Sequence, residues 1–343
     1  MGILSNLFSD SIAIDLGTAN TLIMHNDQIV VNEPSIIAVH QYTGEVVAIG
    51  RKALAMHEKT PENIKTIRPL KDGVISNFHA AEQMIREMIK LIYKGKKAIF
   101  KSVNKMIICI PYGSTEVEKR AVRDSAEHAG AKELYMIHEP VAAALGLGLD
   151  IEQPDGAMVI DIGGGTTEIA IMSLSGVVCN QSLKIAGDVL DKDIQDYMRR
   201  SHNLMIGERT AEKIKMEIGA ALTELDNPPA DMKVIGRDLM TGLPKEKLIS
   251  YTEIAHAIEK SIILLEDAVI KTLETCPPEL ACDIYENGIN LTGGGAALRG
   301  LDKRLSLRTK LPVNISENSL ESVIRGTGIS LKKIGTMKHI LIN

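Results

Sequence analysis

The sequence has few aromatic residues, with no tryptophan and three phenylalanines among 343 residues. Aromatic rings are the platforms on which proteins stack single-stranded nucleic acid. The formal net charge is −5, so no overall excess of positive charge attracts a phosphate backbone either. No nucleic acid partner is therefore expected.

Cysteine is also scarce, and long apolar runs are missing. Of the four cysteines, Cys109, Cys179, Cys276 and Cys282, the last two alone are near each other, and their spacing fits no common zinc motif. Buried, reduced thiols in a reducing cytoplasm are the expectation. No apolar run approaches the roughly 20 residues that a bilayer span needs, and the N-terminus lacks the features of a signal peptide.

Aliphatic residues dominate the apolar fraction, which suits an α/β fold of strands covered by helices. Strands are predicted near 11–16, 20–25, 28–32, 35–39, 46–50, 104–110, 133–138, 157–162, 167–173 and 176–184. Helices are predicted at 78–94, 115–129, 187–200, 209–220 and 252–275. Because hairpins followed by strand–helix alternation return after residue 155, the chain is expected to be an internal duplication of two packed lobes with a cleft between them.

One short motif marks both halves. Residues 12–21 read I-A-I-D-L-G-T-A-N-T, and residues 159–167 read V-I-D-I-G-G-G-T-T. Glycine lets backbone N–H groups approach an anion closely, and Mg²⁺ can bridge Asp15 or Asp161 to a phosphate. Two facing hairpins would grip a polyphosphate from both sides, whereas either copy alone is more often an ordinary turn.

A third glycine run and a glutamate extend this pattern. Residues 291–300, L-T-G-G-G-A-A-L-R-G, follow a short apolar run and open a predicted helix, as in nucleotide cradles, although triple glycine also permits close helix packing. Glu139 precedes Pro140 at the start of an alanine-rich helix expected to pass from one lobe to the other. There it could orient or deprotonate a water that attacks a terminal phosphate. A favourable charge against the helix dipole is the plainer interpretation.

Six motifs in this order resemble those of the MreB family, bacterial actin-like proteins of the actin/Hsp70/hexokinase superfamily. They are D-L-G-T-A-N-T, I-R-P-L-K-D-G-V-I, D-I-G-G-G-T-T-E-I-A, G-E-R-T-A-E-K-I-K-M-E-I-G, C-P-P-E-L-A and L-T-G-G-G-A-A-L-R-G-L. The resemblance covers nearly the whole chain and implies an actin-like (duplicated RNase H-like) two-lobed ATPase fold with four subdomains and a central nucleotide cleft. The implied boundaries are 1–32, 71–144 and 321–343 for subdomain IA, 33–70 for IB, 145–184 and 252–320 for IIA, and 185–251 for IIB.

The resemblance also implies the residues of an ATP and Mg²⁺ site. Glu139 and Thr166 would position the attacking water, and Asp15 and Asp161 would hold Mg²⁺ through water. The implied nucleotide contacts are Asp15, Gly17, Thr18, Ala19, Asn20, Gly163, Gly164, Gly165, Glu212, Lys213, Ile214, Lys215, Gly293, Gly294, Gly295 and Ala296. From spacing alone, the charged segment 207–219 is typical of a solvated helix face. Two departures from the family pattern are His138 before Glu139, and residues 323–328, an approximate match to a small-residue turn.

The family's function would make this chain a slowly hydrolysing ATPase that polymerises into antiparallel double protofilaments. Such filaments lie at the inner face of the cell membrane and direct cell shape and elongation-mode cell-wall synthesis, with membrane proteins of the MreC and RodZ type as partners. Residues 1–8, with four apolar residues on one helical face, and residues 94–105, with five lysines around Ile99 and Phe100, are the predicted membrane contacts. A solvated loop is the alternative for the second segment.

Two other functions use the same phosphate clamp. A small-molecule kinase would need acceptor-binding insertions between the motifs, and the motif spacing leaves little room for them. An Hsp70-like chaperone would need a peptide-binding domain after Gly328, where fifteen residues follow. The spacing therefore favours the filament-forming ATPase.

Overall fold

The computed structural model describes residues 11–93 and 103–342 of the chain. Of the predicted membrane contacts, residues 1–8 and all but the last three residues of 94–105 lie outside the described residues. The chain forms two compact units, unit 1 (1–154, 173–177 and 320–343) and unit 2 (155–172 and 178–319). The further division into four subdomains stays a prediction.

Unit 1 contains a six-stranded sheet in the order β19-β10-β9-β1-β2-β3. Its elements are β1 (Ser11–Leu16), β2 (Asn20–His25), β3 (Gln28–Pro34), β4 (Ile37–His40), β5 (Val46–Ile49), α1 (Gly50–Met56), β6 (Ile64–Ile67), β7 (Leu70–Lys71), β8 (Val74–Ile75), α2 (Phe78–Ile92), β9 (Val103–Ile110), α3 (Glu116–His128), β10 (Ala131–His138), α4 (Glu139–Gly146), α10 (Ser322–Lys332) and β19 (Leu341–Ile342), with a 3-10 turn at Lys338–Ile340.

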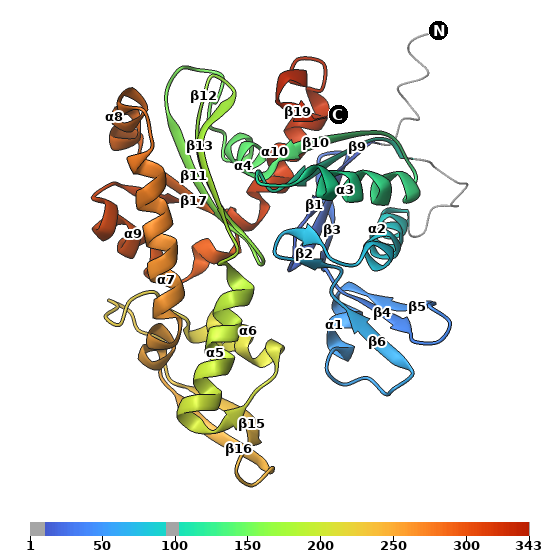
Figure 1. Cartoon of the computed structure of the whole chain (residues 1–343), viewed down its shortest axis with the longest axis vertical. Helices are drawn as coiled ribbons and strands as arrows, with labels where there is room; N and C mark the ends of the chain where they lie inside the picture. Colours follow the sequence, from blue (N-terminus) through green and yellow to red (C-terminus); the bar gives the residue numbers. More distant parts are fainter. Residues whose placement is uncertain (1–10, 94–102, 343) are drawn as a thin grey trace. The chain divides into compact units, whose positions relative to one another are not determined.

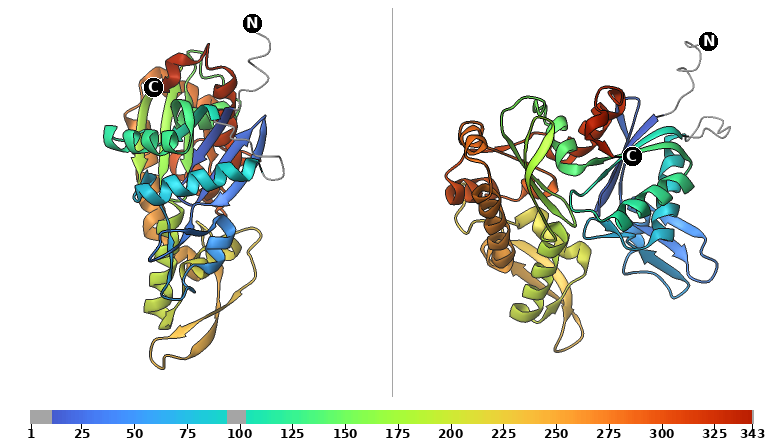
Figure 2. Two further views of the ribbon diagram at one scale, coloured as in Figure 1. Left: turned by 90° about the vertical axis from the view of Figure 1, so that its right-hand side faces the viewer. Right: turned by 45° about the horizontal axis from the view of Figure 1, so that its top comes forward.

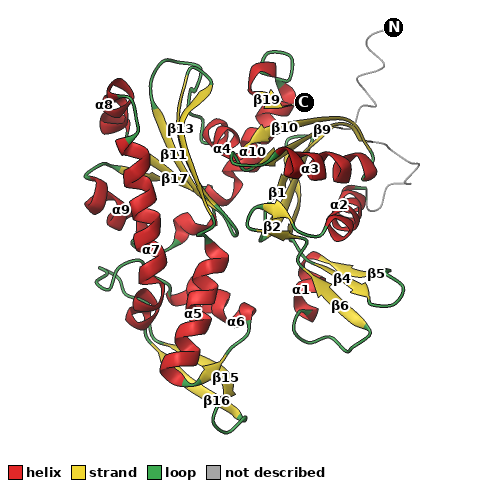
Figure 3. Cartoon of the chain, in the orientation of Figure 1, coloured by secondary structure: helices red, strands yellow, loops and turns green. Residues whose placement is uncertain are grey.

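Helices cover both faces of this sheet (Figures 1 and 3). Ile12 and Ile14 of β1 belong to one buried cluster with side chains of α2 and α3, while Ala13 between them packs with Ile324 of α10. Alternate residues of a strand point to opposite faces, so a strand buried on both sides is apolar throughout. This explains the unbroken apolar run at the start of the predicted first strand.

Unit 2 contains a five-stranded sheet in the order β13-β12-β11-β17-β18. Its elements are β11 (Ala157–Ile162), β12 (Thr167–Ser173), β13 (Gly176–Leu183), α5 (Gly187–His202), β14 (Leu204–Met205), α6 (Glu208–Ile218), β15 (Met232–Asp238), β16 (Pro244–Ile249), α7 (Tyr251–Glu274), α8 (Pro278–Asn287), β17 (Ile289–Thr292), α9 (Leu301–Thr309) and β18 (Val313–Ile315), with 3-10 turns at Gly294–Ala297 and Ser319–Glu321. Met158, Ile160 and Ile162 of β11 share a core with α5, α6, α7 and α9.

The two sheets repeat one topology, which confirms the predicted duplication. In unit 1 the order is β10-β9-β1-β2-β3, and in unit 2 the corresponding order is β18-β17-β11-β12-β13. In each, the first strand pairs antiparallel with the second and parallel with a later strand, β9 or β17. Hairpins make the antiparallel part, and helical crossovers make the parallel part.

Each unit also carries a small three-stranded sheet. In unit 1 it has the order β5-β4-β6, and in unit 2 the order β14-β15-β16. Figure 2 shows the second of these sheets, coloured gold, beside α5 and α6. Apart from β4 and β5, these strands were not predicted from the sequence.

The segment 323–328, expected as a turn, is helical and lies inside α10. Its glycines serve helix packing, because α10 lies against α4 at very short range. A Cβ on Gly326 would sit 1.7 Å from the carbonyl oxygen of Ala142, and a Cβ on Gly146 would sit 1.8 Å from that of Ser322. Consequently α4 lies wholly within unit 1, and the chain enters unit 2 only after Pro154, whereas α4 itself was expected to cross between lobes.

None of the helices in residues 11–93 and 103–342 combines the length and apolar character that crossing a bilayer requires.

Replacing Gly326 by alanine tests this packing. We expect Gly326→Ala to lower the free energy of unfolding by about 2–3 kcal/mol, since overpacking forces backbones apart. Gly335→Ala is the control, because a Cβ there meets nothing within 4 Å. Urea denaturation of both variants measures the difference, and equal midpoints would contradict the contact.

Candidate functional site

In unit 1, hydrogen bonds from Ser35, which lies between β3 and β4, hold the turn between β1 and β2. The Ser35 hydroxyl donates to the Gly17 carbonyl at 2.6 Å, and the Ser35 N–H donates to the Ala19 carbonyl at 2.9 Å. A Cβ on Gly17 would lie 2.6 Å from the Asn20 carbonyl oxygen, so the turn requires glycine. The turn therefore has a fixed shape before any ligand binds.

Two threonines continue this network. The Thr21 and Ser35 hydroxyls are 2.8 Å apart and share a hydrogen bond. Thr18 Oγ1 accepts a hydrogen bond from the Gly73 N–H at 3.0 Å. Gly73 belongs to the β7–β8 turn within the I-R-P-L-K-D-G-V-I motif, so this contact joins two of the sequence motifs.

Asp15, at the end of β1, is a carboxylate in an apolar setting. Burial raises the pKa of Asp15 to about 6, partly offset by a hydrogen bond from the Cys109 thiol to Oδ1 at 3.2 Å. None of the ion pairs among the described residues includes Asp15. A carboxylate in an apolar setting that has no basic side chain as its ion-pair partner is suited to bind a metal ion.

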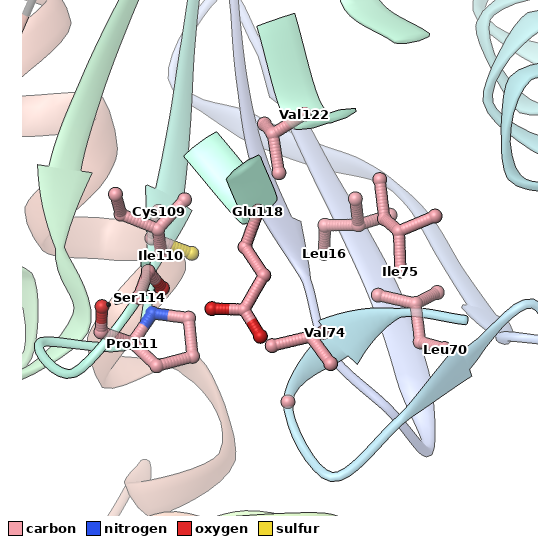
Figure 4. Close-up of a pocket in the computed structure, with 11 residues that line it drawn as sticks. Leu16, Leu70, Val74, Ile75, Cys109, Ile110, Pro111, Ser114, Glu118 and Val122 are labelled. Atoms are coloured by element: carbon pink, nitrogen blue, oxygen red, sulfur yellow. Dashed lines mark hydrogen bonds between the residues drawn. The ribbon is translucent and has the colours of Figure 1, made fainter. Parts of the chain in front are cut away.

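Cys109 contacts this aspartate and is close enough to the predicted catalytic glutamate for that charge to act on its thiol. Burial, and then the negative charges of Asp15 and Glu139, raise the pKa of the Cys109 thiol well above its ordinary value. Figure 4 shows the Cys109 sulfur beside a small pocket at the ends of β1 and β9, whose walls include Leu16 and Pro111. Unit 1 thus holds the Asp15 carboxylate in contact with a neutral thiol, with the charge of Glu139 acting on the same thiol.

Glu139 is the first residue of α4 and follows His138 at the end of β10. The rings of His138 and Tyr112 pack with centroids 4.5 Å apart. Burial, and then the charge of Lys119, lower the pKa of His138, so the imidazole is neutral at pH 7. His138 therefore supplies no positive charge to Glu139.

In unit 2 the loop after β11 is fixed by the start of α5. The N–H groups of Gly187 and Asp188 donate to the carbonyls of Gly163 and Gly164 at 3.1 and 2.8 Å. The first N–H groups of a helix have no partner inside it, so here they orient the loop. The sequence predicted Gly187 and Asp188 as the first residues of a helix, but it did not predict their hydrogen bonds to the loop.

The same loop presents N–H groups of its own. The Gly163 N–H donates a hydrogen bond to the Thr166 carbonyl at 2.9 Å. Within the described part of the chain, the N–H groups of Gly164, Gly165 and Thr166 donate to no backbone carbonyl. N–H groups without a backbone acceptor are available to an anion. The phosphate contact itself stays a prediction.

The third glycine run packs directly on Asp161. Thr292 of β17 pairs with Asp161 of β11, and the next residue, Gly293, has φ of +81°. A Cβ on Gly293 would lie 2.4 Å from Asp161 Oδ1, and one on Gly295 would lie 2.2 Å from Cγ2 of Ile162. The run opens a 3-10 turn, Gly294–Ala297, and not the α-helix expected from the sequence.

The four predicted residues of α6 have different environments. Lys213 is exposed and lies 3.6 Å from Glu217, whereas Ile214 is fully buried in the core and holds α6 in place. Glu212 is partly exposed. The Lys215 ammonium is mostly buried and makes hydrogen bonds within unit 2, described below.

The structure therefore groups the predicted residues by unit. Unit 1 holds Asp15, the residues from Gly17 to Asn20, and Glu139. Unit 2 holds Asp161, the loop 163–166, the run 293–296 and the α6 residues 212–215. Supporting residues that the sequence analysis did not find are Ser35, Gly73, Cys109, Gly187, Asp188 and Asp191.

No group of three or more His, Cys, Asp or Glu side chains within residues 11–93 and 103–342 is arranged to hold a metal ion by itself. Mg²⁺ is commonly held by one or two carboxylates together with waters and substrate phosphates. Asp15 in unit 1 and Asp161 in unit 2 each offer a single carboxylate, so the other ligands of an Mg²⁺ ion at either one would be water or phosphate oxygens.

Replacing Asp15 by asparagine tests its buried charge. The folded state holds the Asp15 proton up to about pH 6, against 3.8 for the ordinary group, so stability falls as pH rises through that interval. In EDTA and without nucleotide, Asp15→Asn should raise the free energy of unfolding, by up to about 3 kcal/mol at pH 7.5 and by less at pH 5. Urea titrations at both pH values measure this. Asp124→Asn, at an exposed ion pair, is the control, and a destabilised Asp15→Asn would overturn the interpretation.

Comparison with known proteins places these features in a family. The family described as MreB/Mbl protein matches residues 9–339. The cell shape-determining protein MreB of Escherichia coli K12 is 45% identical over 333 residues, 96% of this chain and 95% of that protein. The cell shape-determining protein Mbl of Bacillus subtilis 168 is 43% identical over 327 residues, 95% and 96% of the two chains.

Solved structures agree. The crystal structure of MreB5 of Spiroplasma citri bound to AMPPNP superimposes with a TM-score of 0.89 at 39% identity, over 96% of this chain and 98% of that one. The subunit of the MamK double helical filament has a TM-score of 0.78 at 20% identity, over 95% and 99%, and so shows the shared fold alone. The predicted actin-like fold is confirmed, and the chain belongs to the MreB/Mbl family.

Proposed function

We propose that this chain binds and slowly hydrolyses ATP with Mg²⁺, and that nucleotide binding controls its assembly into filaments that determine cell shape. The observation that carries the proposal is the unit 2 loop, where among the described residues the N–H groups of Gly164, Gly165 and Thr166 donate to no backbone carbonyl, and which directly follows the strand that bears the buried Asp161. A nucleotide-bound structure of a relative, MreB5 of Spiroplasma citri with AMPPNP, supports the choice of ligand. The names of the Escherichia coli and Bacillus subtilis relatives support the cellular role.

The residues have distinct tasks in this proposal. The turn Gly17–Asn20 and the loop Gly163–Gly165 bind phosphate oxygens through N–H groups, and Asp15 and Asp161 hold water molecules of a magnesium shell. Mg²⁺, if held there, would neutralise phosphate charge. Residues 212–215 and 293–296 border the ribose and adenine.

Glu139 and Thr166 act on the attacking water in this proposal. Glu139 is the only carboxylate of the two predicted catalytic residues, so it accepts the proton or orients the water, and the Thr166 hydroxyl adds a hydrogen bond. The tight contact of α4 with α10 fixes the backbone that carries Glu139. Slow hydrolysis suits a filament subunit, because the polymer must persist for longer than it takes to assemble.

Membrane attachment is part of the proposal and rests on sequence. Residues 1–8 and 94–105 are the proposed contacts with the cytoplasmic face of the membrane, where anionic headgroups attract the lysines of the second segment. Membrane proteins of the MreC and RodZ type are the proposed partners. The four subdomains IA, IB, IIA and IIB are proposed with the boundaries given above.

Sedimentation tests the function directly. Full-length protein with Mg²⁺ and ATP should pellet as polymer, and anionic liposomes should increase the pelleted fraction. Buffer with EDTA is the control. ATP consumption that depends on an added sugar or carboxylic acid, without polymer, would favour a small-molecule kinase instead.

Removal of the Glu139 carboxylate should separate binding from hydrolysis. We expect Glu139→Ala to bind Mg·ATP as the parent does, to release phosphate at least about 100-fold more slowly, and to form longer-lived polymer. Phosphate release and light scattering measure the two effects. Glu133→Ala, on the preceding strand β10 and exposed, should match the parent. Phosphate release by Glu139→Ala at the parental rate would remove Glu139 from the proposed chemistry.

A pair of glycine variants tests the contact with Asp161. Gly293→Ala and Gly242→Ala carry similar backbone strain, with φ of +81° and +74°, but only a Cβ at 293 collides with Asp161. Gly293→Ala should therefore weaken Mg·ATP binding by about tenfold or more, and Gly242→Ala should not. Fluorescent nucleotide titration provides the affinities. Equal Mg·ATP affinities in the two variants would show that the role of Asp161 in binding does not depend on its packing against Gly293.

A further inference from the structure

Lys215, predicted as a nucleoside contact, uses its ammonium inside unit 2. Its Nζ donates to Asp191 Oδ2 and to the Gly187 carbonyl, each at 2.8 Å. The Lys215 and Asp191 side chains are only 17% and 16% exposed. This ion pair is shielded from water, so removing one partner leaves a charge that is costly to keep.

The Asp191 carboxylate is only half satisfied. Oδ2 accepts from Lys215, but Oδ1 is buried and has no hydrogen-bond partner among the described residues. Burial raises the pKa of Asp191 to about 6, with Lys215 acting in the opposite direction. A buried charged oxygen without a donor destabilises a fold. A contribution to stability alone therefore does not explain an aspartate at position 191.

The bonds around Lys215 form one connected path. At one end, the carbonyls of Gly163 and Gly164 in the phosphate-binding loop accept from the N–H groups of Gly187 and Asp188. The Gly187 carbonyl then accepts from Lys215, which belongs to α6. The path therefore joins the phosphate loop to the helix that carries the nucleoside contacts.

Space at the middle of this path is limited. A Cβ on Gly187 would lie 3.2 Å from Lys215 Nζ and 3.4 Å from the Gly163 carbonyl oxygen. Lys215 and the loop therefore approach the same peptide from close range. Asp191 lies one helical turn further along α5, where it can hold the ammonium against that peptide.

We propose that Asp191 is a positioning residue for the nucleotide site. It holds Lys215 on the Gly187 carbonyl and thereby sets the position of α6 relative to the phosphate loop, without touching the nucleotide itself. The proposal rests on the proposed ATP binding. Its consequence is that a ligand that spans both parts, such as ATP, gains from the coupling, whereas a ligand that occupies the loop alone does not.

The test compares two ligands and a double-mutant cycle. The variants are Asp191→Asn, which keeps the size of the side chain, Lys215→Met, and the double variant. Asp196→Asn is the matched control, since this aspartate lies on the same helix and pairs with Arg199 at the surface. Affinities for Mg·ATP and for Mg·tripolyphosphate, the probe for the loop alone, are measured by calorimetry, with urea denaturation of each variant.

We expect Asp191→Asn to weaken Mg·ATP binding about tenfold, the double variant to lose no more than either single variant, and Mg·tripolyphosphate affinity to stay within about twofold of the parent. The control should match the parent with both ligands. Lys215→Met leaves Asp191 unpaired and should unfold more easily than the double variant.

Three results would overturn the proposal. The first is an Asp191→Asn variant that binds Mg·ATP as tightly as the parent. The second is an equal loss for both ligands together with a lower urea midpoint, which would indicate a structural role alone. The third is additive losses in the double variant, because the two residues would then act separately. Failure of the proposed function is distinguishable, since the parent itself would then not bind Mg·ATP.

Discussion

A carboxylate in the penultimate position of the first strand of each sheet is the constraint on which both units depend. Asp15 stands there in β1 of unit 1, and Asp161, only 7% exposed, stands there in β11 of unit 2. Burying a charge is costly unless something compensates for it. Much of the neighbouring structure follows from these two groups, including the Cys109 thiol beside Asp15 and the bare Gly293 backbone beside Asp161.

The two units support their equivalent turns by different means. In unit 1 a side-chain hydroxyl, that of Ser35, binds the turn carbonyl at Gly17. In unit 2 the N–H groups at the start of α5 bind the loop carbonyls of Gly163 and Gly164. Ser35 lies in the link between β3 and β4, so the first turn is held without a helix, whereas the second loop is held by α5. The duplicated topology thus contains one turn held from a link between strands and one held by a helix.

The sequence predicted the parts of the fold that have regular periodicity. All ten predicted strands and five predicted helices are present within a few residues, because each has a clear apolar period. Helix α10 was missed because its glycines and β-branched residues disfavour helix locally, and only packing on α4 requires them there. Among site residues, the glycine motifs were visible, but Ser35 and Asp191 were not, since each acts through a partner distant in sequence.

The charges of the candidate site favour a metal–phosphate complex over either component alone. In unit 2, a phosphate by itself would meet the loop N–H groups but also the negative charge of Asp161. In unit 1, a phosphate at the β1–β2 turn would meet the charges of Asp15 and Glu139. A cation by itself would find single carboxylates, and no cluster of three within the described residues. When both enter together, the cation offsets the carboxylates and the N–H groups bind the phosphate oxygens. Under the proposed function, Asp15 and Asp161 would therefore disfavour an anion that arrives without its metal.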